Sequence, residues 1–192
     1  MAEVVEIPGY VAGAWAIDPV HSTVSFIIRH LMVSKVRGGF GSLEGEIVTG
    51  VDPLDSSVTA AIDMTLINTN NRQRDEHIRS ADFFEVEKYP TSTFRSTAVR
   101  RDGEDFFLDG ELTIKAVTRP VTFKLEVDGF APDAHRKDPM AGARAGFSAT
   151  TELNRSDFDV SFNSPIPGGG VALSEKVQIT VEIEAALTSR VR

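Results

Sequence analysis

The sequence contains no cysteine. Disulfide bonds, thiolate catalysis and cysteine-ligated zinc are therefore excluded, and the absence is consistent with a reducing compartment. Long apolar runs are also missing, because the longest one, counting glycine, covers only Gly9 to Ile17. A membrane-spanning helix needs about 20 such residues. No Lys or Arg precedes Arg29, so no secretory signal is expected. These absences predict a cytoplasmic protein without stable membrane insertion.

Basic residues are scarce as well. The chain has 20 Lys and Arg against 28 Asp and Glu, which gives a net charge of −8. Binding to nucleic acid relies on clustered cations, whereas the basic residues here are scattered along the sequence. We therefore expect no nucleic-acid partner. The same acidity argues against docking on an anionic membrane surface.

Alternation of apolar and polar residues is the dominant pattern, and it is typical of β-strands. It is clear at 20–28, 58–66, 106–114, 121–127 and 177–183, and weaker at 13–18, 40–49, 92–100 and 143–153. Each segment has one apolar face, as in antiparallel sheets that expose one face to solvent. A sheet of this size must fold over or close on itself. The 192 residues thus predict one all-β domain, either a sandwich or a closed barrel.

One segment interrupts the alternation. Arg74 to Pro90 reads RDEHIRSADFFEVEKYP, with a charged first half and an aromatic, acidic second half. Asn70 or Asn71 is suited to cap the start of a helix. The sequence predicts a short helix at about 70–84, between two strands, that covers one end of the barrel. We expect Phe83 and Phe84 to point into the interior.

Catalytic motifs are not recognisable. The four histidines are His21, His30, His77 and His135, and a zinc site needs three or four converging ligands. His21, His30 and His77 could converge with Asp18 or Asp75, but hydrogen-bonded histidines at the barrel ends are the favoured interpretation. No Gly-x-Ser-x-Gly elbow occurs. We expect no enzyme activity and no required cofactor or metal. The alternative is a small-molecule enzyme with a histidine or metal site at the barrel mouth around His30 and His77.

An ordered set of short motifs resembles a known family. The motifs are Asp18-Pro19-Val20-His21-Ser22, Arg29-His30, Arg74-Asp75-Glu76-His77, Phe83-Phe84, Lys88-Tyr89-Pro90 and Gly110-Glu111-Leu112-Thr113-Ile114. In this order the chain resembles the YceI-like polyisoprenoid-binding family over roughly residues 13–187, which leaves residues 1–12 as a loose arm. The resemblance implies an extended eight-stranded antiparallel lipocalin-like barrel and an isoprenoid ligand, such as a polyprenyl phosphate or a quinone. It also implies a homodimer. Many members carry a secretory leader, which is not recognised here.

The apolar strand faces supply the residues expected to meet such a ligand. On the strand pattern alone, these side chains could fill a solid core, as in a structural or interaction protein, or line a tunnel. The resemblance favours a tunnel that carries or sequesters the ligand. The expected lining consists of Val24, Phe26, Ile28, Phe40, Ile62, Met64, Leu66, Phe83, Phe84, Phe94, Phe106, Leu112, Ile114, Phe123, Leu125, Phe147, Ile179 and Val181. The polar candidates for a head group or mouth are Arg29, His30, Asn70, Arg72 and His77, because arginine pairs well with phosphate.

Overall fold

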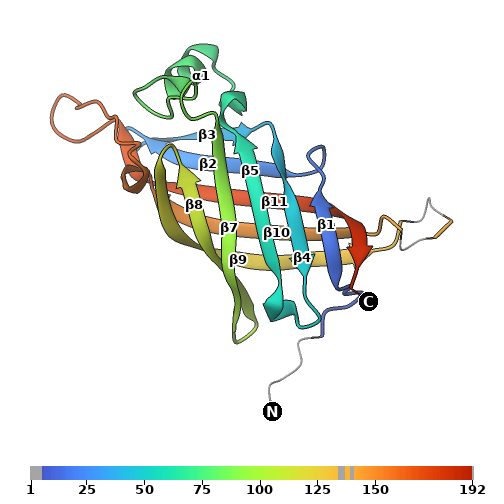
Figure 1. The fold of residues 1–192 in the computed structure, drawn as a ribbon. Helices are drawn as coiled ribbons and strands as arrows, with labels where there is room; N and C mark the ends of the chain where they lie inside the picture. The colour runs from blue at the N-terminus through green and yellow to red at the C-terminus, as the bar shows by residue number, and fades with distance from the viewer. Residues whose placement is uncertain (1–5, 134–136, 139–140, 192) are drawn as a thin grey trace.

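The chain forms a closed antiparallel barrel of eight strands, as the family resemblance implies (Figure 1). The computed structural model describes residues 6–133, 137–138 and 141–191. In sheet order the barrel strands are β1 (Gly13–Ile17), β4 (Leu43–Thr49), β5 (Ser57–Asp63), β7 (Thr91–Asp102), β8 (Asp105–Ile114), β9 (Val117–Ala131), β10 (Arg144–Asn154) and β11 (Leu173–Arg190). Pairing of β11 with β1 closes the barrel.

Three more strands extend the sheet beyond this closure: β2 (Thr23–His30), β3 (Ser34–Phe40) and β6 (Ile67–Asn68). The long strand β11 pairs with β1 through its last residues and with β2 through residues 173–182. From β2 the sheet continues to β3 and ends at β6. Strand β3 is not predicted separately from the sequence, because Gly38 and Gly39 obscure the alternation at its end.

The end of β5 differs from the sequence prediction. Alternation predicts a strand that continues to Leu66, but β5 ends at Asp63 and a 3₁₀ helix, η2, covers Met64–Leu66. The Asp63 carboxylate accepts hydrogen bonds from the Thr65 amide at 2.9 Å and from its hydroxyl at 2.6 Å. Because Asp63 caps a 3₁₀ helix here, the side chains of Met64–Leu66 repeat about every three residues and no longer alternate between two faces as in a strand. Met64 remains buried, whereas Leu66 is 46% exposed and lies off the inner face.

The helix α1 (Arg72–Arg79) sits over one end of the barrel and is shorter than the expected 70–84 (Figure 1). The Asn71 side chain caps it by accepting from the Arg74 amide at 2.9 Å. The buried Asp75 carboxylate accepts from the Thr69 amide at 2.9 Å, and Arg79 donates to the Ile67 carbonyl at 2.7 Å. These contacts fasten α1 to β6. The remaining helical turns are η1 (Pro53–Asp55) and η3 (Arg155–Phe158). No helix in the described part of the chain is long and apolar enough to cross a membrane.

The buried side chains form two clusters. One surrounds Trp15, which is completely buried, and the other surrounds Phe83 and Phe158 below α1. Trp15 donates its indole N–H to the Thr49 hydroxyl at 2.8 Å, and that hydroxyl donates to the Val11 carbonyl at 2.7 Å. Residues 1–12 are expected to form a loose arm, and residues 1–5 lie outside the described residues. The hydrogen bond from Thr49 holds Val11 against the barrel.

Candidate ligand cavity

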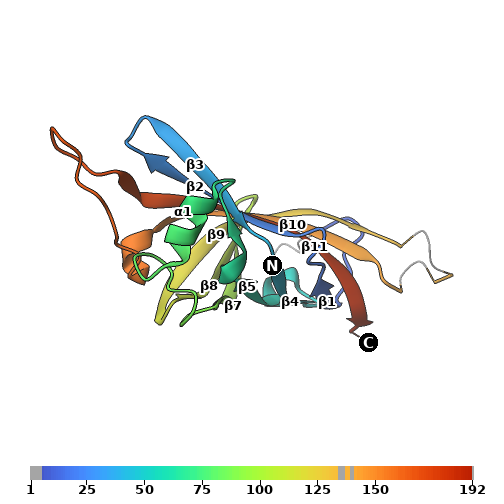
Figure 2. The same cartoon turned by 90° about the horizontal axis from the view of Figure 1, so that it is seen from above.

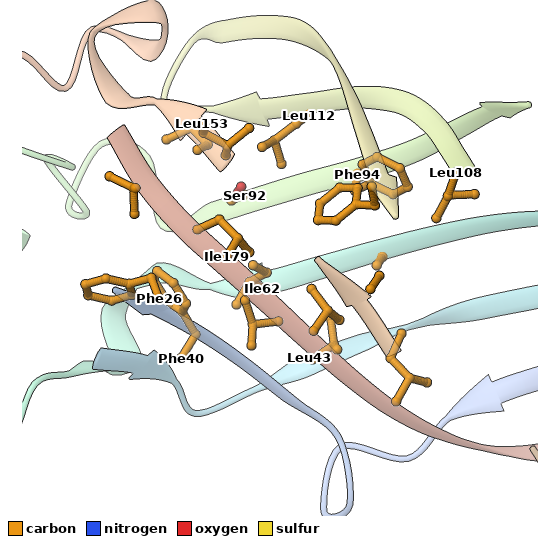
Figure 3. A pocket seen from close by; sticks show the side chains of 18 of the residues that line it. Phe26, Phe40, Leu43, Ile62, Ser92, Phe94, Leu108, Leu112, Leu153 and Ile179 are labelled. Atoms are coloured by element: carbon orange, nitrogen blue, oxygen red, sulfur yellow. The ribbon is translucent and has the colours of Figure 1, made fainter. Parts of the chain in front are cut away.

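An elongated apolar cavity of about 490 Å³ lies inside the barrel (Figure 3). Ligand sites commonly measure ~300–1,000 Å³. Leu173 and Ile183, ten residues apart on β11, both line it, and at ~3.3 Å per residue this corresponds to ~33 Å of strand. The cavity therefore runs along the barrel, which favours a tunnel over a completely filled core.

Most of the expected lining residues face this cavity. Those that line it are Val24, Phe26, Ile28, Phe40, Ile62, Met64, Phe83, Phe84, Phe94, Phe106, Leu112, Ile114, Phe123, Leu125, Phe147, Ile179 and Val181. Leu66 is the exception, because η2 turns it outward. Sequence reasoning missed Phe158, Val160 and Phe162, which lie in the irregular stretch after β10 and also line the cavity.

Two glycines shape the aromatic wall. Phe94 on β7 lies over Gly110 of β8, and Phe26 on β2 lies over Gly38 of β3; a Cβ atom at either glycine would overlap the ring. Because no side chain stands there, each ring can lie flat against the neighbouring strand. One polar group on the wall, the Ser92 hydroxyl visible in Figure 3, donates a hydrogen bond to the Thr113 carbonyl at 2.7 Å.

The polar candidates separate into two groups. His30 and His77 line the cavity, whereas Arg29, Asn70 and Arg72 are exposed and do not. Arg72 is 92% exposed and its guanidinium contacts the Glu76 carboxylate at 2.9 Å. The two histidines are therefore the members of the predicted set that lie where a bound molecule would meet them.

Two arginines that the sequence analysis did not propose also line the cavity. Arg74 donates from Nε to the Thr69 hydroxyl and from Nη2 to the Thr69 carbonyl, both at 2.7 Å. Arg74 belongs to the Arg74-Asp75-Glu76-His77 motif, which was a signal for its importance. The bonds to Thr69 fix the guanidinium at the end of the cavity covered by α1.

Arg155 is the more deeply buried of the two, with a side chain only 5% exposed. It donates to the carbonyl oxygens of Ser174 at 2.9 Å and of Val160 and Phe162 at 2.8 Å each. Its remaining contact is the Glu175 carboxylate at 3.3 Å. Arg155 thus holds the segment after η3 against the start of β11. No local pattern in the sequence indicated this role.

His77 is fixed by its neighbours. Its Nε2 lies 2.7 Å from the Asp82 carboxylate, and its ring meets Phe83 and Phe162 edge-on. The Ser80 hydroxyl donates to the His77 backbone carbonyl at 2.7 Å rather than to the ring. In a catalytic Ser-His-Asp arrangement, the serine hydroxyl must lie within hydrogen-bond distance of the histidine ring. The geometry therefore favours a positioning or binding role for His77.

A group of possible metal ligands lies away from the cavity. The ligand atoms of Asp18, His21 and Glu184 fall within 4.8 Å of one another, and neither His30 nor His77 joins such a group among the described residues. The Arg144 guanidinium lies 3.1 Å from Asp18 and 3.5 Å from Glu184, so a cationic side chain already offsets part of the negative charge of this cluster. His135 lies outside the described residues.

The His21–Asp18 pair predicts a measurable titration shift. Its hydrogen bond raises the pKa of His21 above 6.5 and lowers the pKa of Asp18 to about 2. The contribution of His21 to stability is present below pH 6.5 and is lost as the pH rises through its raised pKa. That of Asp18 is present above its ordinary pKa of 3.8 and is lost as the pH falls towards 2. Asp18→Asn should lower the pKa of His21, followed by NMR of its ring protons, with the other histidines as references. An unchanged His21 titration would contradict this assignment.

The closed barrel and its elongated apolar cavity define a lipocalin-like protein. Residues 15–185 match the model of the YceI-like domain, and the chain belongs to this family, as the motifs indicated. It is 38% identical to Protein YceI of Escherichia coli O157:H7 over 141 residues, 73% of this chain and 71% of the relative. The Campylobacter jejuni YCEI protein is 29% identical with a TM-score of 0.69, covering 84% and 90% of the two chains.

A more distant solved structure shares the fold. It is the polyisoprenoid binding domain from Saccharophagus degradans implicated in plant cell wall breakdown, with 16% identity and a TM-score of 0.65. The match covers 93% of this chain and 99% of that domain.

Proposed function

We propose that this protein binds a long-chain isoprenoid, of the polyprenyl phosphate or quinone type, or a similar amphiphile, and carries or sequesters it. The observation that carries the proposal is the elongated apolar cavity along the barrel. Membership of the YceI-like family and the shared fold of the Saccharophagus polyisoprenoid binding domain support it. The tail occupies the cavity and is shielded from water, and no chemical step is required.

The physics of burial favours a long apolar tail. Removing apolar surface from water contributes ~25 cal/mol per Å², and this term depends little on which apolar side chains make the contact. A wall of aliphatic side chains and phenylalanines therefore accepts a flexible chain without specific polar groups. Specificity arises at the end of the cavity, where polar side chains converge.

The head group is assigned to the end of the cavity that holds His30, Arg74 and His77. The His30 imidazole makes no hydrogen bond to a described residue, and Arg74 uses only Nε and Nη2 on Thr69. Both side chains thus retain donors for an oxygen-rich head group. Guanidinium groups bind phosphate oxygens strongly, which favours an anionic head. Most donors of Arg155 are occupied by backbone carbonyls, so it is left out of this assignment.

The first test examines the purified protein directly. Mass spectrometry of its organic extract is expected to detect an isoprenoid, and added polyprenyl phosphate or quinone should raise its melting temperature. A chain that yields no lipid and shows no shift with either compound would rule out the proposal.

The head-group assignment is tested by Arg74→Gln. This variant should weaken binding of a polyprenyl phosphate by about tenfold, as expected for the loss of a hydrogen bond to a charged group. Its affinity for a quinone with a tail of equal length should change much less. Arg72→Gln, two residues earlier and exposed, is the matched control and should leave both affinities intact. Equal loss for the two ligands in Arg74→Gln would contradict the assignment.

A further inference from the structure

The turn between β2 and β3 exposes three large apolar side chains in succession. Leu31 is 37% exposed, Met32 59% and Val33 84%. Leu31 and Met32 also have positive φ angles of 51° and 58°, a region that large apolar residues rarely adopt. The positive φ angles are those that a tight hairpin turn requires at its two central residues, here closed by the Val33 amide on the His30 carbonyl. The exposure of three large apolar side chains is unfavourable for an isolated protein in water, and a surface contact that uses them would account for it.

A second loop projects beside this turn. Residues 164–172 form an irregular hairpin in which Pro165 bridges to Val171, and Val171 is 44% exposed. The Leu31 amide donates to the Ala172 carbonyl at 2.8 Å, which joins the two loops. They project from the same end of the barrel in both views (Figures 1 and 2). Residues 31–33 and 164–171 are together named the apolar tip.

The β2–β3 hairpin of the apolar tip is basic, although the protein as a whole is acidic. Residues 19–43 contain no Asp or Glu, and residues 160–174 contain no charged side chain at all. Arg29, Lys35 and Arg37 are exposed on the β2–β3 hairpin, and none forms an ion pair with a described residue. Arg29 lies directly opposite Lys35 in the strand register, a like-charge arrangement that is unfavourable without an external anion. The net charge of −8 therefore conceals a local basic region.

The apolar tip adjoins the ligand cavity. His30 and Val36, at the base of the β2–β3 turn, line the cavity, as do Ala172 and Leu173 at the base of the second loop. A surface that contacts the tip would thus lie next to the end of the cavity that holds the polar side chains.

We propose that the apolar tip docks on an anionic lipid bilayer. Leu31, Met32 and Val33 enter the boundary between head groups and acyl chains, while Arg29, Lys35 and Arg37 remain at the anionic head groups. Apolar side chains next to basic ones are the combination that binds reversibly to such surfaces. The inference goes beyond the proposed function, because it concerns an outer surface and holds whichever molecule occupies the cavity. The acidity of the whole chain, which argues against docking on an anionic membrane, does not extend to the β2–β3 hairpin.

The test measures partitioning of the full chain onto vesicles by sedimentation at low ionic strength. The protein should bind phosphatidylcholine vesicles containing phosphatidylglycerol, and bind pure phosphatidylcholine much more weakly. The double variant Met32→Asp, Val33→Asp should lose at least about tenfold in partitioning. The triple variant Arg29→Gln, Lys35→Gln, Arg37→Gln should lose about 100-fold. Val51→Asp is the matched control, because Val51 is 81% exposed on the β4–β5 connection, and it should bind like the unmodified protein.

A fluorescent label locates the contact. Because the chain has no cysteine, Val33→Cys and Val51→Cys each provide a single site for an environment-sensitive fluorophore. Anionic vesicles should shift the emission of the label at position 33 to shorter wavelength and leave that at position 51 unchanged. Absence of partitioning by the unmodified protein, or equal label shifts at both positions, would overturn the proposal. So would concentration-dependent self-association through the tip without vesicle binding, which would identify a contact between two copies of this chain.

Discussion

Ala60→Phe is expected to remove most of the affinity for an isoprenoid tail. The Ala60 side chain lines the cavity on β5, opposite Phe94 of β7 and Gly45 of β4. An added ring would occupy space that the tail requires. If the tail loses ~100 Å² of burial, the cost is ~2.5 kcal/mol, which corresponds to an increase in Kd approaching 100-fold. Fluorescence competition or calorimetry with a polyprenyl phosphate measures the change.

The adjacent residue supplies the matched control. Ala61 lies next in β5, so its side chain points to the other face of the sheet, and it is absent from the cavity lining. Ala61→Phe adds the same ring outside the barrel and should bind the ligand normally. Thermal unfolding of both variants separates blocked binding from lost folding. Tight binding by a well-folded Ala60→Phe variant would place the tail elsewhere.

Arg155→Met is expected to cause the largest loss of stability among the substitutions considered. It removes the donors that satisfy the carbonyls of Val160, Phe162 and Ser174. A buried acceptor left without a partner costs about 1–3 kcal/mol, so a total of ~3–5 kcal/mol is expected. For a domain of this size, the melting temperature should fall by about 10 °C. Thermal denaturation by circular dichroism measures it.

Two further variants isolate this effect. Arg155→Lys keeps the charge but cannot reach three carbonyls with the same planar fork, and its melting temperature should be intermediate. Arg72→Met removes an exposed arginine whose ion pair among the described residues is with Glu76, and should change stability by less than about 0.5 kcal/mol. Similar melting temperatures for Arg155→Met and Arg72→Met would show that the segment after η3 does not depend on Arg155.

Alternation carried most of the prediction of the strands, whereas the choice of a barrel over a sandwich came from the family resemblance. Along β11, Val177, Ile179, Val181 and Ile183 alternate in the sequence and all line the cavity, because a regular strand places every second residue on one face. The same rule failed at Leu66, where the Asp63 side chain competes with the strand for backbone hydrogen bonds. A period of two thus predicts the face of a residue only while the strand continues.

The polar part of the site was harder to predict. His77 was placed at the mouth from its motif, and it lines the cavity. Arg29 and Arg72 were chosen because arginine suits phosphate, yet both side chains point to solvent. Arg155 was missed because its partners are backbone carbonyls in a loop without regular structure. Which charges turn inward depends on tertiary contacts that the local sequence does not encode.

Strand β11 has a consequence for how the molecule folds and opens. One edge of β11 pairs first with β2 and then, towards its C-terminal end, with β1. The pairing with β1 brings Gly13 next to Arg190. Contacts between such distant segments require closure of a very long loop before they become favourable, which slows folding. The pairings of β11 with β1 and with β2 must break together before the barrel wall can open. We therefore expect the amides of β11 to be among the slowest to exchange with deuterium, and a ligand to enter and leave through the end of the barrel while its wall stays shut.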